Sequence, residues 1–405
     1  MNRIYSLNLR HLGALLQVGA AGTLSAAAQA VSLSQPALVQ AIAKLEQTLE
    51  TALFVRHPQG VASTEAGDRF LARTRRALDY LDRGVQQIRR AARQPALAHV
   101  ERRVSMSQLR ALVSVVESSS YAGAAAVLGL SQPSLHRAMR ELQEVVQVTL
   151  LERAGRSIRP TAPAGRLVHF VQLMLAELRA GLDEASTRHR GLGGHLRVGV
   201  MPVARAHFLP RVLAGFCRQR PAAFVDIIEG PYAELLARLR QGEMDVLIAS
   251  WREDLTARDV TQEILFDDAL VIVGRAGHPL QGRRRLSTAA LRAHPWVIPA
   301  PGTPMRRSWE RMFQLRGHAP PPLQVQCGSV MIMRGLMLED DWLALMSRDQ
   351  FRLESQAGRL IELGSPGAGF GRRVAMTCRT DWWPTPLQSA FIEAFRSVRS
   401  ERAPP

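Results

Sequence analysis

The chain has 405 residues, 46% of them hydrophobic and 21% charged, which is an ordinary composition for a globular protein of about two to four domains. Its formal net charge at pH 7 is +17, and such an excess favours an anionic partner, either nucleic acid or a membrane face. No stretch reaches about 18 consecutive apolar residues, so a membrane span is not expected.

The first predicted elements form a helix-turn-helix. Apolar residues recur at helical spacing from Leu9 onward, and a second, short helix of small side chains is predicted over 26–30. After a turn, Ser34 is a favourable helix N-cap, and Pro36 fits the first turn of a third helix, where its missing N–H costs nothing. The stretch over 53–64 is then expected to form a hairpin-like wing.

Residues 106–161 repeat residues 9–64 at a shift of 97 positions. By direct count, 16 of the 56 aligned positions are identical, and the run Leu-Ser-Gln-Pro at 33–36 recurs at 130–133. A period this long is the length of a small domain rather than of a solenoid repeat. The sequence therefore predicts a duplicated domain, of which the second copy carries the more basic wing.

A long helical pattern follows each wing, over 65–92 and over 163–190. Each predicted helix carries an apolar stripe, which must be buried against another element of this chain or of a partner chain. Two interpretations stay open. The two copies in one chain could pair with each other, since the connector at 93–105 can span roughly 43 Å when extended and successive half-sites on DNA are about 34 Å apart. Alternatively, the first copy is a decayed domain that serves only for packing.

A different pattern starts after the glycine-rich junction at 191–194. Over 196–250, apolar strands alternate with amphipathic helices, which predicts parallel β-α-β units. Apolar runs at 270–273 and 343–346 continue the pattern, and a final helix is expected over 386–399. The second half of the chain is therefore predicted to be an α/β domain.

Several short motifs carry a family resemblance. The first copy contains Ser-Gln-Pro-Ala-Leu at 34–38, Leu-Phe-Val-Arg at 53–56 and Thr-Glu-Ala-Gly at 64–67, in that order. It thereby resembles the N-terminal DNA-binding domain of LysR-type transcriptional regulators. The run Gly-Glu-Met-Asp-Val-Leu-Ile at 242–248 is similar to a step in the effector domain of the same family.

The chain also departs from the family pattern. The first copy has Val39-Gln40 where the family usually has a Ser-Arg pair, whereas the second copy keeps the arginine as Arg137. The second copy has Leu151 in place of the phenylalanine of the wing motif, and an extra residue over 162–165. Typical members carry only one such domain, so the tandem copy is itself a departure.

The resemblance implies a multi-domain chain. Two α-helix-rich winged helix-turn-helix domains should precede an α/β effector domain with the two-lobed fold of type II periplasmic binding proteins. The expected winged domains are residues 1–64 and 106–162, the linker helices 65–92 and 163–190, the connector 93–105, and the effector domain 195–400. Lobe one is expected at 195–272 plus 370–400, and lobe two at 273–369.

In a winged domain, the third helix enters the major groove of DNA and wing residues hold phosphates. Glutamine can pair bidentately with adenine, and arginine with guanine. The predicted DNA-binding residues of the first copy are Ser34, Gln35, Pro36, Ala37, Gln40, Lys44 and Arg56. Those of the second copy are Ser131, Gln132, Pro133, Ser134, His136, Arg137, Arg140, Arg153, Arg156 and Arg159.

In two-lobed folds, ligands bind in the cleft, at the carboxyl ends of strands. The predicted effector-binding residues are Met201, Pro202, Val203, Pro231, Ser250, Trp251, Pro301, Gly302, Thr303 and Ser329. Many family members carry Ser or Thr where this chain has Met-Pro-Val at 201–203, which weakens any assignment of a carboxylate ligand. A small-molecule effector is expected, and the sequence does not identify it.

The chain contains no G-x-S-x-G, H-E-x-x-H or Walker motif, so neither enzymatic activity nor a cofactor is expected. The three cysteines, Cys217, Cys327 and Cys378, form no Cys-x-x-Cys pair, which predicts buried reduced thiols rather than a disulfide framework or a zinc site.

The predicted function is sequence-specific, effector-gated regulation of transcription in the cytoplasm. The expected partners are double-stranded DNA, a small-molecule effector, further copies of the chain in a dimer or tetramer, and RNA polymerase, but no membrane. The alternative is a cytosolic solute-binding or small-molecule enzyme domain fused to DNA-binding modules.

Overall fold

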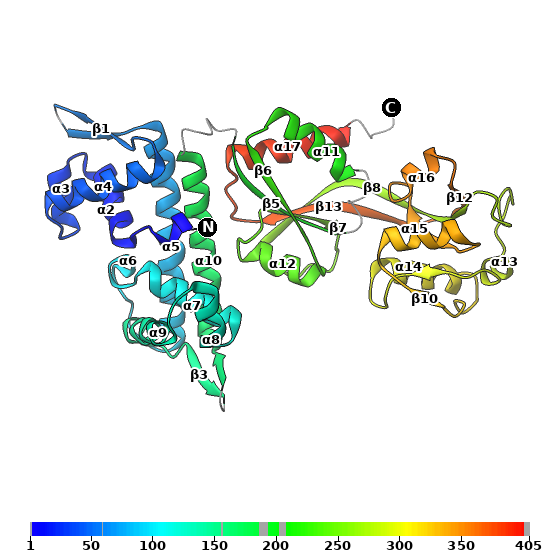
Figure 1. Cartoon of the computed structure of the whole chain (residues 1–405), viewed down its shortest axis with the longest axis horizontal. Coiled ribbons are helices and arrows are strands. Elements are labelled where there is room, and N and C mark those ends of the chain that lie inside the picture. Colours follow the sequence, from blue (N-terminus) through cyan, green and yellow to red (C-terminus); the bar gives the residue numbers. More distant parts are fainter. Residues whose placement is uncertain (1, 59, 155–156, 186–192, 202–207, 401–405) are drawn as a thin grey trace.

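The computed structural model describes residues 2–58, 60–154, 157–185, 193–201 and 208–400. Three of the predicted site residues, Arg156, Pro202 and Val203, lie outside these ranges. Figure 1 shows two helical units toward opposite ends of a pair of long helices, and an α/β domain on the other side of that pair.

In the described residues, each helical unit contains three helices and a two-stranded antiparallel hairpin, in the order of a winged helix-turn-helix. A short helix, α1 (Asn2–Tyr5), precedes the first unit. The first unit consists of α2 (Leu9–Ala21), α3 (Leu24–Ala30), α4 (Gln35–Leu49), β1 (Phe54–His57) and β2 (Gly60–Ser63). The second unit consists of α7 (Met106–Ser118), α8 (Tyr121–Leu128), α9 (Gln132–Val146), β3 (Leu151–Ala154) and β4 (Ser157–Pro160).

The two units use the same local hydrogen bonds at positions 97 residues apart. Ser34 and Ser131 cap α4 and α9, and each hydroxyl accepts from the N–H three residues further on, at 3.3 Å. The Glu46 carboxylate accepts the two N–H groups at the start of β1 at 2.7 and 3.1 Å, and the Gln143 amide oxygen accepts those at the start of β3 at 2.8 and 3.1 Å. The two predicted N-caps are therefore confirmed.

The long helices are α5 (Glu65–Ala91) and α10 (Ala162–Ala185), which lie side by side in Figure 1. A Cβ atom on Gly84 would lie 2.6 Å from the Cβ of Phe170, and one on Gly181 would lie 3.0 Å from the Cβ of Arg73. A shift of 97 residues converts Gly84 to Gly181 and Arg73 to Phe170. The two contacts are thus one antiparallel contact repeated by a pseudo-two-fold axis, as in a symmetric dimer interface.

The connector over 93–105 contains a helical turn that the sequence did not predict. This turn is α6 (Val100–Arg103), and Val100 is 1% exposed. Arg102 donates to the carbonyl oxygen of Ala30 at 3.0 Å, at the end of α3. The connector therefore packs against the first unit instead of stretching between the units.

The α/β domain begins with the three parallel strands that the sequence predicted, β5 (Gly194–Val200), β6 (Ala223–Glu229) and β7 (Val246–Ser250). The prediction that the parallel pattern of this sheet continues past residue 250 is wrong. The chain crosses to the second lobe along β8 (Val260–Arg275) and returns along β13 (Gly371–Arg379), so these two strands run in opposite directions. Their neighbours, β7, β11 and β12, also pair with them in antiparallel fashion.

In the described residues, the sheet has the strand order β11-β8-β13-β7-β5-β6, with β12 also paired to β8. The helices of the first lobe are α11 (Phe208–Gln219), α12 (Tyr232–Arg240) and α17 (Pro386–Ser400). The second lobe contains α13 (Thr288–Arg292), β9 (Val297–Ile298), α14 (Pro304–Gln314), β10 (Val325–Gln326), α15 (Val330–Glu339), β11 (Ala344–Ser347), α16 (Arg352–Gln356) and β12 (Leu360–Gly364).

The change of lobe falls inside β8, slightly before the predicted boundary at residue 272. Up to Ala269 this strand pairs with β13, and from Leu270 onward it pairs with β11 and β12. Each side has its own apolar core, with Phe391 and Phe395 in the first lobe and Trp296 and Trp309 in the second. The two lobes are therefore joined by two long strands, which is where a hinge would act.

The helices of the described ranges include none that is both long and apolar enough to cross a membrane. Cys217 is exposed, so the prediction of three buried thiols is wrong for this residue, while Cys327 and Cys378 are partly buried. Burial raises the pKa of the Cys378 thiol to about 12, which keeps it in the unreactive thiol form.

Candidate nucleic-acid interface and effector site

The second unit buries the apolar stripe of α9 and exposes its predicted DNA-binding side chains. Leu135, Met139 and Leu142 are at most 1% exposed. The predicted residues from Ser131 to Arg140 are all exposed. Five of them border an open hollow of about 840 Å³ between α7, α8 and α9, namely Pro133, Ser134, His136, Arg137 and Arg140. This helix can therefore enter a groove without disturbing its own core.

In the described residues, the arginines of α9 form weak ion pairs. Arg137 lies 3.9 Å from Glu141, and Arg140 lies 3.7 Å from Glu144, with exposed side chains in both pairs. Exposed pairs of this kind contribute at most about 1 kcal/mol, so either arginine can turn toward a base edge or a phosphate at little cost.

The His136 ring stacks on Tyr121 of α8, with ring centroids 3.6 Å apart. Tyr121 was not among the predicted residues, because an aromatic residue at the start of a helix has no signature of DNA binding. At the matching positions the first unit has Leu24 and Val39, which cannot form such a stack. The two units therefore differ beside their third helices.

The first unit has the same architecture as the second, but its predicted DNA-binding residues include fewer cations. Gln35, Gln40 and Lys44 of α4 are exposed, as is Arg56 on β1. Its predicted set carries two cations. In the second unit, Arg153 and Arg159 of the wing are also exposed and add to the two arginines of α9. Two such surfaces would bind different base sequences, and the second would neutralise more phosphates.

One residue that the sequence did not indicate ties α9 to the long helices. Arg89 of α5 is 3% exposed and donates to the carbonyl oxygens of Val146 at 2.7 Å and Pro95 at 2.8 Å. Val146 is the last residue of α9, where carbonyl groups lack helical partners and a cation is favourable. A helix of the first half of the chain thus holds the end of the third helix of the second unit.

The role of α9 can be tested by comparing base-reading with phosphate-binding positions. Gln132→Ala and Arg137→Ala should each weaken binding to the preferred duplex by about 1–3 kcal/mol and relax its base preference. Arg159→Ala should weaken binding to all sequences alike, because a phosphate contact carries no base information. Competition binding with systematically mutated duplexes measures both effects. Equal, sequence-blind losses in all three variants would show that α9 is not the reading helix.

The predicted effector-binding residues form two groups, one in each lobe. Met201 follows β5, Pro231 is the residue before α12, and Trp251 follows Ser250 at the end of β7. In the second lobe, Thr303 caps α14 after β9, next to Pro301 and Gly302. Ser329 stands at the N-cap position of α15 after β10, without a capping bond from its side chain. The residues of this set that the structure describes lie at or after strand ends, and their role in binding stays a prediction.

Backbone pairing fixes two of these residues at the edge of the first lobe. The Met201 N–H donates to the Ile248 oxygen at 2.9 Å, and the Trp251 N–H donates to the Arg373 oxygen at 2.7 Å. Within the described ranges, the buried indole N–H of Trp251 has no hydrogen-bond partner, and the Arg373 guanidinium carbon lies 5.2 Å from the Trp251 ring. This side chain therefore has a donor to offer to a ligand.

The contacts that bridge the lobes come from residues that were not predicted. The backbone N–H of Phe208 in the first lobe donates to the Asp349 carboxylate in the second at 3.2 Å. At the crossover, Arg372 donates to Asp268 at 2.8 Å and to Gln350 at 3.4 Å. Burial raises the pKa of the Asp268 carboxyl, and the Arg372 guanidinium opposes that shift. These residues come from separate segments, so no local spacing could reveal them.

In the part of the chain that the structure describes, no group of three or more His, Cys, Asp or Glu side chains is placed to hold a metal ion.

Both halves of the chain match known protein families. The LysR substrate binding domain matches residues 189–400, and the lysR-family bacterial regulatory helix-turn-helix protein matches two segments, 9–68 and 106–166. The chain is 28% identical to the HTH-type transcriptional regulator GalR of Pseudomonas putida over 396 residues, which are 98% of each chain. It is 26% identical to PcaQ, a regulator of Agrobacterium fabrum, over 302 residues, which are 75% of this chain and 97% of PcaQ.

Among solved structures, a full-length variant of OxyR from Pseudomonas aeruginosa has a TM-score of 0.54 and 20% identity, covering 72% of this chain and 93% of that one. At this identity the likeness shows the fold alone. The curated relatives are transcriptional regulators rather than enzymes. Since the substrate-binding match spans more than half of the chain, the protein belongs to the LysR family of DNA-binding transcriptional regulators and carries the effector-binding domain of that family.

Proposed function

We propose that one chain of this regulator reads two different half-sites on a single duplex. Its two helical units act as tandem winged helix-turn-helix domains, and the antiparallel pair of α5 and α10 sets the distance between them. A small molecule between the two lobes of the α/β domain gates this binding.

The observation that supports the proposal is the pseudo-two-fold contact between the long helices. Gly84 packs on Phe170, and Gly181 packs on Arg73, the two pairs being related by the 97-residue shift. An isologous contact of this type normally joins two identical chains. Here both partners belong to one chain. Each long helix therefore buries its apolar stripe against the other within that chain. A decayed first copy would not need to preserve this symmetry.

The two half-sites should differ in sequence, because the outward residues of the third helices differ. Ser134, His136 and Arg137 of α9 correspond to Ala37, Val39 and Gln40 of α4. A selected operator should therefore show two unlike half-sites, about 34 Å apart or at a multiple of that distance. Duplex selection from a random pool, followed by footprinting, tests this. A single perfect palindrome bound by the second units of two chains would contradict the proposal.

The pairing of the helices makes a specific stability prediction. Gly84→Ala should lower the free energy of unfolding by about 1–3 kcal/mol, because the new Cβ would lie 2.6 Å from the Cβ of Phe170 and force the helices apart. Gly165→Ala in α10 is the matched control, since a Cβ there would meet nothing within 4 Å. Chemical denaturation measures both. Equal stability of the two variants would show that α5 and α10 do not pack as described.

Gating by the effector rests on the connection between the lobes. The lobes share β8 and β13, and the backbone N–H of Phe208 donates to Asp349 from one lobe to the other. A ligand that binds one arrangement of the lobes more tightly shifts the population toward that arrangement. We propose that this shift changes the DNA spacing or bend that an assembly of chains prefers. An effector that leaves the footprint unchanged would contradict this part of the proposal.

A further inference from the structure

Two aromatic rings meet at the surface that the second unit would present to DNA. The Tyr121 ring of α8 and the His136 ring of α9 are stacked, with centroids 3.6 Å apart and 26° between their planes. His136 is exposed, whereas Tyr121 is partly buried, which raises the pKa of its hydroxyl. Both residues border the open hollow between α7, α8 and α9. A solvent-facing imidazole is thus backed by a ring that belongs partly to the interior of the unit.

The start of α8 fixes the position of Tyr121. Tyr121 is the first residue of this helix, and the Ser120 hydroxyl caps the helix by accepting from the Gly123 N–H at 2.9 Å. Ala124 in the same turn is 0% exposed, and Tyr121 packs against the same apolar core. The Tyr121 ring is therefore a firm support for the imidazole rather than a second mobile side chain.

Stacking restricts an imidazole that would otherwise exchange between several rotamers. An aromatic contact of this kind favours one ring orientation by about 2- to 12-fold. The stacked ring uses its face for the contact and leaves its edge, with both nitrogens, available for hydrogen bonds. In the major groove, guanine and adenine both present N7 as an acceptor. An imidazole N–H held in one place can therefore select a purine at the base pair that it faces.

The stack is not needed for the fold of a unit. At the positions 97 residues earlier, the first unit has Leu24 and Val39, which are both partly buried. In the described residues, the first unit nevertheless has its three helices and its hairpin in the same order as the second. The aromatic pair is therefore an addition to the surface of one unit, which points to a role in choosing the base sequence of that unit.

We infer that Tyr121 is a positioning residue for base reading by the second unit. It holds the His136 imidazole so that the ring edge donates to the N7 of a purine in the half-site that α9 reads, the second half-site. This inference rests on the proposed function, and it adds a specificity determinant that lies outside the third helix. Without the Tyr121 ring, a smaller fraction of molecules has the imidazole correctly oriented, and the apparent affinity for the preferred duplex falls by that fraction.

Competition binding of the full chain, with duplexes mutated one base pair at a time, tests this inference. The native chain should prefer a purine at one base pair of the second half-site by about 2- to 12-fold, the range of a single hydrogen bond. His136→Ala should abolish that preference. Tyr121→Leu, which installs the residue of the first unit, should remove most of it, whereas Tyr121→Phe should retain it because the stack needs only the ring.

Two further variants make the result specific to the pair. Tyr121→Leu combined with His136→Ala should bind no more weakly than His136→Ala alone, because the two residues act as a unit. Val127→Ala is the matched control on α8, since Val127 is 75% exposed and lies outside the stack. It should leave the purine preference unchanged.

The reverse experiment moves the pair to the first unit. Leu24→Tyr together with Val39→His should create a purine preference at the matching base pair of the first half-site. Val39→His alone should create little, because nothing would hold its ring. Affinity for the unaltered second half-site, measured on the same samples, reports whether these variants are folded.

Three outcomes would overturn the inference. They are a native chain without such a preference, a full preference in Tyr121→Leu, and a loss in Tyr121→Leu that is equal for all base sequences. Each of them leaves the proposed function standing, because the chain still binds both half-sites. Failure of the native chain to bind either selected half-site would instead overturn the proposed function, and the inference with it.

Discussion

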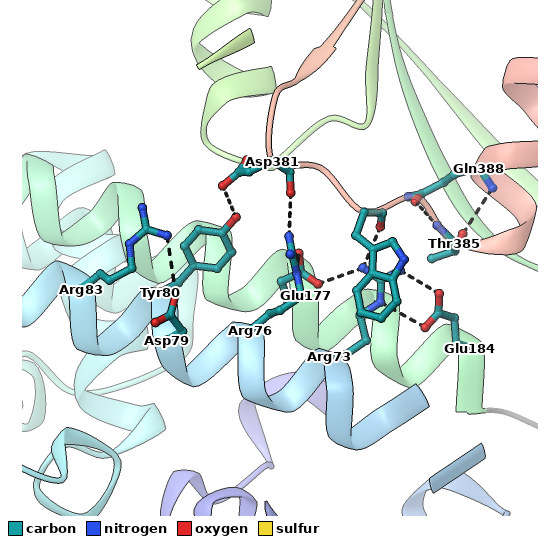
Figure 2. Close-up of polar contacts among 11 residues, drawn as sticks. Arg73, Arg76, Asp79, Tyr80, Arg83, Glu177, Glu184, Asp381, Thr385 and Gln388 are labelled. Carbon is teal, nitrogen blue, oxygen red and sulfur yellow. Dashed lines mark hydrogen bonds and ion pairs between the residues drawn. The ribbon is translucent and has the colours of Figure 1, made fainter. Parts of the chain in front are cut away.

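Replacing Arg73 with methionine should lower the free energy of unfolding by about 3–5 kcal/mol, since this change leaves the buried carboxylates of Glu177 and Glu184 without their shared partner (Figure 2). The side chain is retained in size, so the loss reports charge and hydrogen bonding rather than a cavity. Chemical denaturation followed by the helical signal measures it.

Two further variants make the Arg73 result specific. Arg83→Met removes an exposed arginine of the same helix, whose partner Asp79 lies 3.6 Å away, and should cost less than about 1 kcal/mol. The triple variant Arg73→Met, Glu177→Gln, Glu184→Gln should recover much of the lost stability, because no charge is left buried alone. Equal losses in the Arg73 and Arg83 variants would show that Arg73 is not buried between charged partners.

Scrambling one half-site of the selected duplex should weaken binding about 10²- to 10⁴-fold. When one unit of a chain has bound its half-site, the other unit binds the second half-site in an intramolecular step, at a high effective concentration. This gain in affinity is lost when either half-site is scrambled. Inserting about five base pairs between the half-sites should cause a similar loss, because half a helical turn moves the second half-site to the opposite face. Titration of labelled duplexes at fixed salt measures these affinities.

The matched control for this prediction scrambles the same number of base pairs outside both half-sites and should leave the affinity unchanged. If loss of the first half-site changes affinity no more than this control, the first unit does not read DNA. In that case the first unit would serve for packing, the alternative that the sequence left open.

Local signals predicted the local structure well. Ser34 and Ser131 begin their helices as expected, since an N-cap hydroxyl acts within three residues. The helix predicted over 65–92 is α5 to within one residue, because a long amphipathic stripe has few alternatives. The parallel strands β5, β6 and β7 were also correct, since each is separated from the next by a helix.

The sequence could not show the features that depend on distant partners. Arg73 is one of many arginines in an amphipathic helix, and only its partners 104, 111 and 310 residues away reveal that it is buried. The antiparallel return of β13 was missed because an apolar strand has the same pattern in either direction. The crossover residues Asp268 and Arg372 likewise meet only after the sheet has formed.

The most direct test of the central claim, that the two units of one chain occupy one operator, is complementation between two defective chains. One carries Gln35→Glu and Lys44→Glu in the first unit, and the other carries Arg137→Glu and Arg140→Glu in the second. Pairing within one chain predicts that an equimolar mixture binds the two-half-site duplex no more tightly than either variant alone. Recovery of native affinity by the mixture would contradict it, because units of different chains would then be reading adjacent half-sites.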